Sequence, residues 1–250
     1  MPRHLGSARR VRQPWFHNKA ALTGGRPKKG VSSHQLGRQL GLSYKTAHFL
    51  SMRVREAMNL PPETDEGPLG GEGKIIESDE TFVGGKKKNV HVGKPAPKKH
   101  PVHALVERGG KLRAKHVPDV TAKTLRDAIV TQASRKSELH TDDALAYYWL
   151  GREFKRHRAV NHSAKQYVTK DGQAHVNTAE SFFAILKRQI YGSHHSVSEA
   201  HLFRYVNEAM FRWNHRIAMG YDDAARAAVA IRGARGKRLT YRRIDEAPNP

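Results

Sequence analysis

Hydrophobic residues recur at helical spacing between positions 32 and 58 and predict two short helices joined by a turn. The first helix begins in a capping pattern at residues 32–35 and carries Leu36 and Leu40 on one face. Residues 41–43, Gly-Leu-Ser, supply the tight turn. The apolar stripe of the second helix consists of Ala47, Leu50, Val54 and Ala57.

The second helix is expected to keep polar and basic residues on its outer face. A glycine-containing turn followed by a basic second helix is typical of a helix-turn-helix, whose second helix enters the major groove of DNA. An ordinary basic helical hairpin would give the same pattern. If the helix binds DNA, the candidate contact residues are Tyr44, Lys45, His48, Arg53 and Arg55.

From position 74 the pattern changes to short apolar segments typical of β-strands. A strand over 74–79 leads to a glycine turn, and strands over 102–106 and 112–117 flank a second glycine turn as a hairpin. Strands that come first as a meander and then alternate with helices predict an α/β fold, a mixed sheet flanked by helices. The later elements expected are a helix over 121–133, a strand over 138–142, a helix over 144–150, a strand over 157–161, and helices over 178–190 and 198–216.

Charge changes abruptly along the chain and suggests where its parts begin. Residues 1–60 contain twelve Lys or Arg and one acid, whereas residues 61–80 contain seven acids and one lysine. The stretch between them is rich in Pro and Gly and cannot continue a helix. The expected organisation is a basic arm over 1–30, a helix-turn-helix region over 31–60, a linker over 61–73, an α/β domain over 74–217 and a basic C-terminal tail over 218–250. The arginine-rich start could also imitate an organellar transit peptide, but the basic character continues into the expected fold.

Composition narrows the possible functions. The formal net charge of +22 favours nucleic acid as the partner, ahead of ribosomal or histone-like binding and of anionic membrane surfaces. The chain has no cysteine, which excludes disulfides, thiol nucleophiles and cysteine-ligated zinc, so no zinc is expected. A mean hydropathy of −0.72 and the lack of a long apolar run predict a cytoplasmic protein with no membrane partner.

Three acids stand where a sheet could bring them together. Asp79 and Asp142 end expected strands, and Glu180 lies in the first turn of an expected helix. Carboxylate oxygens suit Mg²⁺ or Mn²⁺, and two such ions roughly 4 Å apart can drive phosphoryl transfer on nucleic acid. Asn177, Ala184 and Lys187 fall on the same side of that helix as Glu180, and Arg188 continues the basic edge.

Each acid also has a purely structural interpretation. Residues 177–180 have the spacing of a capping box, in which Asn177 caps the helix and Glu180 bonds back to it. Either Asp142 or Asp143 could be the functional acid, or cap the next helix, and Asp79 with Glu80 could be a plain pair of strand-end acids. For the histidine pair 194–195 a solvated turn is favoured over a metal site.

Several motifs in order resemble the DDE transposases of bacterial insertion sequences, specifically the ISXO-type group. The resemblance extends from about residue 30 to residue 216 and includes the helix-turn-helix. Its motifs are ESDETFVGGK at 77–86, HTDD at 140–143 with Tyr147, VNHS at 160–163, HVNTAESFF at 175–183, LKR at 186–188 and YG at 191–192.

The resemblance implies an RNase H-like catalytic domain over 74–217 that binds two Mg²⁺ or Mn²⁺ ions. Its acid triad would be Asp79, Asp142 and Glu180, with Asn177 as the neighbour of the last acid. The enzyme would cut double-stranded DNA at terminal inverted repeats and direct the freed 3′-OH at target DNA, as a homo-oligomer associated with the bacterial nucleoid. His162 and Lys187 are further candidates for phosphate contact, although His162 could equally be structural.

The chain departs from this group in one respect. Its members commonly begin with a cysteine-rich zinc ribbon, and this chain has no cysteine. Either the ribbon has been lost from a truncated copy, or the helix-turn-helix and basic arm recognise the ends alone. A remnant that only binds DNA, and an RNase H-like nuclease without strand transfer, therefore remain alternatives.

Overall fold

The computed structural model describes residues 30–60, 67–85, 93–95, 97–142, 145–160 and 174–237. Near its start, helices α2 (Ser33–Leu40) and α3 (Tyr44–Met58) form the expected pair. The side chains of Ser32 and Ser43 cap the two helices by accepting hydrogen bonds from the backbone N–H groups of Gln35 and Thr46. Gly41 ends α2 in the left-handed region at φ 66°, where glycine is unstrained, so the chain reverses within three residues.

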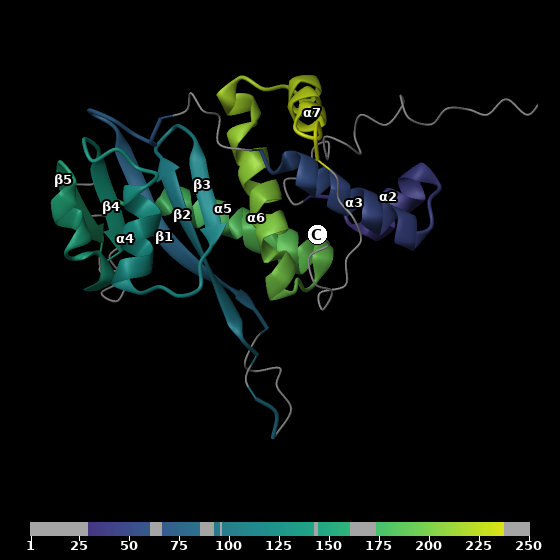
Figure 1. Ribbon diagram of the computed structural model, residues 1–250, viewed down its shortest axis with the longest axis horizontal. Helices are drawn as coiled ribbons and strands as arrows, with labels where there is room; N and C mark the ends of the chain where they lie inside the picture. The colour runs from purple at the N-terminus through teal and green to yellow at the C-terminus, as the bar shows by residue number, and fades with distance from the viewer. Residues whose placement is uncertain are drawn as a thin grey trace, which may run out of the picture.

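A five-stranded mixed sheet forms one side of the molecule, on the left in Figure 1. Its strands are β1 (Ile75–Gly84), β2 (Lys99–Glu107), β3 (Leu112–His116), β4 (Glu138–Asp142) and β5 (Arg156–Val160), in the order β3-β2-β1-β4-β5. The first three strands are antiparallel, and β4 and β5 run parallel to β1. The meander followed by crossover strands confirms the predicted α/β fold, a mixed sheet flanked by helices.

The two faces of the sheet bury separate apolar cores because successive residues of β1 point in opposite directions. Val83 packs on the face covered by α5 (Asn177–Gln189) and α6 (Glu199–Asn214). Ile76 packs on the other face, under α4 (Ala122–Val130) and two 3₁₀ turns at Leu145–Tyr147 and Leu150–Glu153. The apolar stripe expected on α5 is confirmed, since the side chains of Ala179, Phe182, Phe183, Leu186 and Ile190 are all buried.

The helical pair packs against the C-terminal helices of the chain. Met58 of α3, Phe211 of α6 and Ala230 of α7 (Asp223–Arg232) bury one another in a third apolar cluster. Figure 1 shows α3, α6 and α7 gathered on one side of the sheet. Part of the stretch expected as a basic tail over 218–250 instead forms the alanine-rich helix α7, whose Ala230 is buried in this cluster.

The expected linker is also shorter than its composition indicated. Leu69 is buried in the core under α4, and its backbone N–H donates to the carbonyl of Gln132 at 2.7 Å. The carbonyl of Leu69 accepts from the N–H of Ser134 at 2.8 Å. One leucine in a Gly- and Pro-rich stretch is enough to dock the chain, so residues 69–73 belong to the α/β domain. Residues 61–66 lie outside the described residues.

Two further elements differ from their predictions. The strand expected over 74–79 continues to Gly84, because β2 pairs with it along its whole length, and the paired ends project as a hairpin (Figure 1). The helix expected over 144–150 is replaced by the two 3₁₀ turns. In the described part of the chain, no helix combines the length and apolar composition that a membrane span requires.

Candidate active site

Strand register brings Asp79 and Asp142 to the place where the parallel pairing of β1 and β4 ends, which we call the sheet edge. β1 and β4 are parallel neighbours, and Glu77 lies opposite His140. Asp79 and Asp142 lie two residues further along the two strands, just beyond this last pair, and the negative charge of Asp142 acts on Asp79. Both are partly buried, and both follow the stretch where the two strands pair.

The charges of four acids meet at this edge. The pKa of Asp79 is raised to about 8, first by burial of its carboxyl group and then by the negative charges of Glu80, Asp142 and Glu180. One hydrogen bond opposes the rise, since the backbone N–H of Glu80 donates to Oδ1 of Asp79 at 2.8 Å. An acid with so high a pKa is protonated at neutral pH unless a cation neutralises its surroundings. A cation bound at this edge would therefore favour the ionised form of Asp79.

Glu180 reaches this edge because α5 begins beside it. The helix is held at its start by Glu77, whose buried carboxylate accepts from the backbone N–H groups of Thr178 at 2.8 Å and Ala179 at 3.2 Å. The hydroxyl of Thr178 donates to the same carboxylate at 2.8 Å. A negative side chain at a helix N-terminus satisfies N–H groups that have no partner within the helix.

This arrangement corrects the capping-box interpretation. Asn177 is the first residue of α5 rather than its N-cap, and Val176, the residue before it, makes no side-chain capping bond. Glu77 provides the cap from another strand. The side chains of Asn177 and Glu180 are exposed on the outer face of the helix, together with Ala184 and Lys187, as their spacing predicted. Arg188 is also exposed, and its Nε donates to the carbonyl of Ala184 at 3.1 Å.

Behind Glu77 lies a polar network that sequence analysis did not predict. Arg108 donates from Nε to Glu77 at 3.0 Å and from Nη2 to Nδ1 of His140 at 3.1 Å and to the carbonyl of His175 at 3.2 Å. Because arginine only donates, Nδ1 of His140 accepts, and its Nε2–H donates to Glu138 at 2.9 Å. The network joins β1, β4 and the turn after β2 to the start of α5. The available signal was that Glu77 lies two residues before Asp79, on the same face of a strand.

Glu80 is a second residue whose environment the sequence did not reveal. It points to the opposite face from Asp79, where the hydroxyl of the buried Tyr147 donates to it. Burial raises the pKa of Glu80 to about 7, and the charge of Asp142 adds to the rise. The edge therefore carries a further carboxylate beside the expected three.

The three expected metal-binding acids do not form the closest group of possible metal ligands in the described part of the chain. Among the residues that the structure describes, the one group of three His, Asp or Glu side chains with ligand atoms all within 4.8 Å consists of His100, His116 and Glu199. Asp79, Asp142 and Glu180 influence one another through charge at the sheet edge instead. Asp143 and His162 lie outside the described residues.

Comparison with known proteins places this chain in a family. Residues 68–214 match the ISXO2-like transposase domain. The chain belongs to this family. The match begins just before the buried Leu69 and ends with α6, so it includes Asp79, Asp142 and Glu180 and leaves out α2, α3 and α7.

A relative supports the assignment. The chain is 30% identical over 201 residues to an uncharacterized protein in transposable element ISH50 of Halobacterium salinarum, and this covers 73% of the chain and 64% of that protein. The chain thus spans less than two thirds of the length of this relative. Crystal structures of a pre-cleavage Mos1 transpososome and of the mariner Mos1 paired end complex with Mg align at 12% identity with TM-scores of 0.34 and 0.33. These alignments cover 96% and 94% of this chain and 83% and 79% of the respective Mos1 chains.

Outside the matched part of this ISXO2-like transposase domain, α3 divides into an exposed and a buried half. Tyr44, Lys45 and Arg53 are exposed as predicted, and the guanidinium of Arg53 lies 4.3 Å above the ring of Phe49. His48 is half buried, with Nδ1 3.4 Å from the hydroxyl of Ser33. The exposed positions lie mainly in the N-terminal half of α3.

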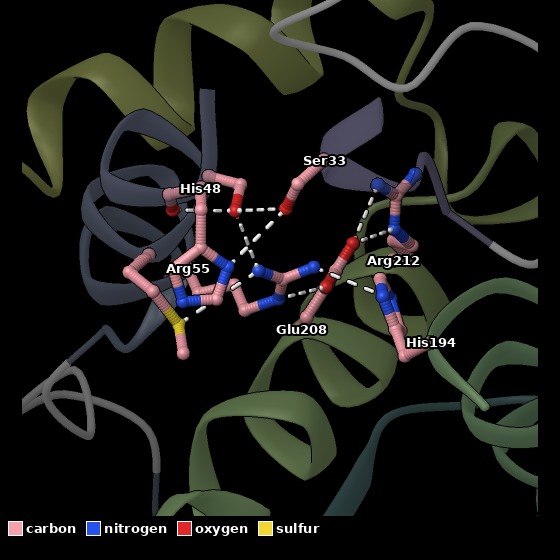
Figure 2. Close-up of polar contacts among 8 residues, drawn as sticks. Ser33, His48, Arg55, His194, Glu208 and Arg212 are labelled. Atoms are coloured by element: carbon pink, nitrogen blue, oxygen red, sulfur yellow. Dashed lines mark hydrogen bonds and ion pairs between the residues drawn. The ribbon is translucent and has the colours of Figure 1, made fainter. Parts of the chain in front are cut away.

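Arg55 is buried, so its expected position on the outer face is wrong. Its Nε donates to Glu208 of α6 at 2.8 Å, Nη1 donates to Ser51 at 3.1 Å, and Nη2 lies 3.2 Å from Nε2 of His194 (Figure 2). Arg212 pairs with the other oxygen of Glu208 at 2.8 Å. Sequence analysis could not predict the burial of Arg55, because its partner Glu208 lies on a helix far along the chain.

The solvated turn expected at the histidine pair is wrong for His194. This residue ends a π-helical turn (Ile190–His194), and burial, followed by the charge of Arg55, lowers the pKa of its imidazole to about 4. His195 is exposed and takes a positive φ of 62°. The domain therefore joins α3 to α6 through one largely buried polar cluster.

Proposed function

We propose that this protein is a DDE transposase that binds the ends of a mobile DNA element and carries out metal-dependent cleavage and strand transfer. Its catalytic acids are Asp79, Asp142 and Glu180, with Asn177 beside the last. The observation that carries the proposal is the convergence of these carboxylates at one sheet edge in a chain of net charge +22, where burial, and then the neighbouring negative charges, raise the pKa of Asp79 to about 8. A cluster that disfavours its own ionisation is unusual outside functional sites.

The donor chemistry at this edge fits Mg²⁺ or Mn²⁺. The three candidate ligands are carboxylates, and these hard oxygen donors are the ones that both ions prefer. A cation would also offset the repulsion that raises the pKa of Asp79. When bound, a pair of such ions would activate the attacking oxygen and stabilise the leaving oxygen of a phosphodiester.

The protein itself would position these groups and guide DNA. Glu77 fixes the start of α5 and so the place from which Glu180 is presented. Lys187 and Arg188, exposed on the same helix, are placed to contact phosphates, and so are Tyr44, Lys45 and Arg53 on α3. The N-terminal residues of a recognition helix usually meet the base edges, and the N-terminal half of α3 is the exposed half. Joining two ends to one target implies a homo-oligomer on DNA.

The test is a cleavage and strand-transfer assay on DNA carrying the inverted repeats that flank the gene, with Mg²⁺ or Mn²⁺. We expect the purified protein to release 3′-OH ends and to form joined products. Asp79→Asn, Asp142→Asn and Glu180→Gln should each abolish both products. The control Asp127→Asn changes an exposed aspartate of α4 and should leave both unchanged. Equal products from wild type and Asp79→Asn would refute the assignment of the site.

The same assay separates the two alternatives. Cleavage without any joined product would indicate a hydrolytic nuclease of the same fold. Specific binding to end DNA without cleavage in either metal would indicate a remnant that only binds DNA. Either result would overturn the proposal of strand transfer.

A further inference from the structure

Two histidines and one glutamate meet at the end of the sheet where α6 begins. His116 of β3 lies opposite Val102 of β2, and His100 lies two residues before Val102 on the same strand. Residues two apart on a strand share a face, so both imidazoles lie on the face that α5 and α6 cover. Glu199 is the first residue of α6 and approaches the same point. Their ligand atoms all lie within 4.8 Å of one another.

One ring nitrogen of each histidine lacks a hydrogen-bond partner. Nδ1 of His100 and Nε2 of His116 are both buried, and neither makes a hydrogen bond. Nδ1 of His100 lies 3.3 Å from Oε1 of Glu199 without hydrogen-bond geometry. Buried polar atoms are normally satisfied, and two orphaned ring nitrogens from neighbouring strands are a specific exception.

We propose that His100, His116 and Glu199 bind a divalent transition-metal ion, with Zn²⁺ as the ion that their chemistry suits best. Two imidazoles and one carboxylate form an established zinc ligand set, which leaves a fourth position for water. Imidazole nitrogen does not suit Mg²⁺, so this site differs in kind from the carboxylate edge around Asp79. The absence of cysteine led to the expectation of no zinc, but it excludes only thiolate ligands.

The side-chain ammonium of Lys98 pairs with Glu199 at the proposed metal site. Its Nζ lies 3.0 Å and 3.3 Å from the two carboxylate oxygens of Glu199, and both side chains are exposed. A bound metal ion would compete with this ammonium for Glu199. Removing Lys98 should therefore strengthen metal binding, whereas a simple surface ion pair would predict no such effect.

The site would hold two parts of the molecule together. One ion would join β2 and β3 to the start of α6. A second contact holds the neighbouring end of β1, because the hydroxyl of Tyr191 donates to the carbonyl of Gly84 at 3.0 Å and accepts from its N–H at 3.2 Å. The metal would therefore secure the base of the hairpin that projects from the sheet (Figure 1).

The experiment is a titration of the untagged, EDTA-dialysed full chain with Co²⁺, followed by its displacement with Zn²⁺. We expect one Co²⁺ per chain to give a visible absorption band typical of nitrogen and oxygen ligands, and a rise in melting temperature with Zn²⁺. His100→Ala and His116→Ala should weaken binding by at least about tenfold, since loss of even an outer partner of a ligand has an effect of that size. Lys98→Ala should tighten it severalfold.

Two controls keep the result specific. His195→Ala changes an exposed histidine elsewhere and should leave the Co²⁺ band and affinity unchanged. Asp79→Asn should abolish DNA cleavage yet keep this metal site, so failure of the catalytic proposal and failure of this one are distinguishable. Glu199→Gln preserves the shape of the side chain and should weaken binding even if a histidine variant folds poorly. Retention of the Co²⁺ band and affinity in His100→Ala and His116→Ala would overturn the proposal.

Discussion

Glu77 and Thr178 are joined by two hydrogen bonds of 2.8 Å, although 101 positions of chain separate them. One uses the backbone N–H of Thr178 and the other its hydroxyl, and both end on a carboxylate that solvent does not reach. This contact links the strand that carries Asp79 to the helix that carries Glu180. The relative position of Asp79 and Glu180 therefore depends on Glu77.

Glu77→Gln should destabilise the protein by ~3 kcal/mol, because it breaks a buried ion pair and leaves Arg108 without its countercharge. Urea unfolding measures this directly. Cleavage should also fall under conditions where the variant is folded, since α5 loses its anchor. The control Glu72→Gln changes an exposed acid paired with Lys155 and should cost less than ~1 kcal/mol. Equal stability of both variants would refute the anchoring role.

Asp79→Asn should stabilise the metal-free protein at alkaline pH. The pKa of Asp79 is about 8 in the fold against an ordinary value of 3.8. The stability that this raised pKa gives the fold is therefore complete below pH 4 and is lost as pH rises to 8. Asparagine stays neutral throughout. At pH 8 in EDTA the variant should be more stable by at least ~1.4 kcal/mol, the equivalent of one pKa unit, and the difference should shrink toward pH 4.

Added Mn²⁺ should reverse that order. A ligand that binds only the folded state stabilises it, by ~2.7 kcal/mol at a concentration of 100 times Kd, and the wild type alone keeps the full set of acids. Thermal unfolding with and without Mn²⁺ at pH 8 is the measurement, with Asp127→Asn as the control. A wild type that is more stable than Asp79→Asn at pH 8 in EDTA would contradict the raised pKa.

Arg53 and Arg55 lie two residues apart on α3 and should behave in opposite ways. Arg55→Met should cost about 2–3 kcal/mol of stability, less than the ~3–5 kcal/mol for a lone buried pair, because Arg212 still pairs with Glu208. Arg53→Ala should change stability by less than ~0.5 kcal/mol. It should instead weaken binding to end DNA and reduce the slope of log K against log salt by about 0.9.

Chemical denaturation and DNA titration at several salt concentrations distinguish the two arginines. Each variant serves as the control for the other, since both remove one positive charge from the same helix. If Arg53→Ala leaves the salt dependence of DNA binding unchanged, α3 does not contact DNA through this residue.

His194→Gln should remove part of the acid sensitivity of the fold. The pKa of His194 is lowered to about 4 from an ordinary 6.5. The stability that this lowered pKa gives the fold is therefore complete above pH 6.5 and is lost as pH falls toward 4. In the fold its Nε2 accepts from Arg55, which only neutral imidazole can do. Urea midpoints at pH 7 and pH 4.5 should differ less in the variant than in wild type, whereas the exposed His195→Gln should match wild type.

Local sequence determined most of the elements of this protein. Helical periodicity and serine caps defined α2 and α3, and β4 begins and ends at the predicted residues. The exposed row of Asn177, Glu180, Ala184 and Lys187 also followed from spacing alone. These features depend on residues within a few positions of one another, so the printed order of residues contains the necessary information.

Contacts between distant segments were decided only by the tertiary structure. The partner of Arg55 is Glu208, the cap of α5 is Glu77 rather than Asn177, and the three side chains His100, His116 and Glu199 come from two strands and a helix. No spacing rule joins such residues, because strand order and helix packing place them together. Burial then sets their chemistry, since the same carboxyl that would ionise freely in water has a pKa of about 8 in Asp79.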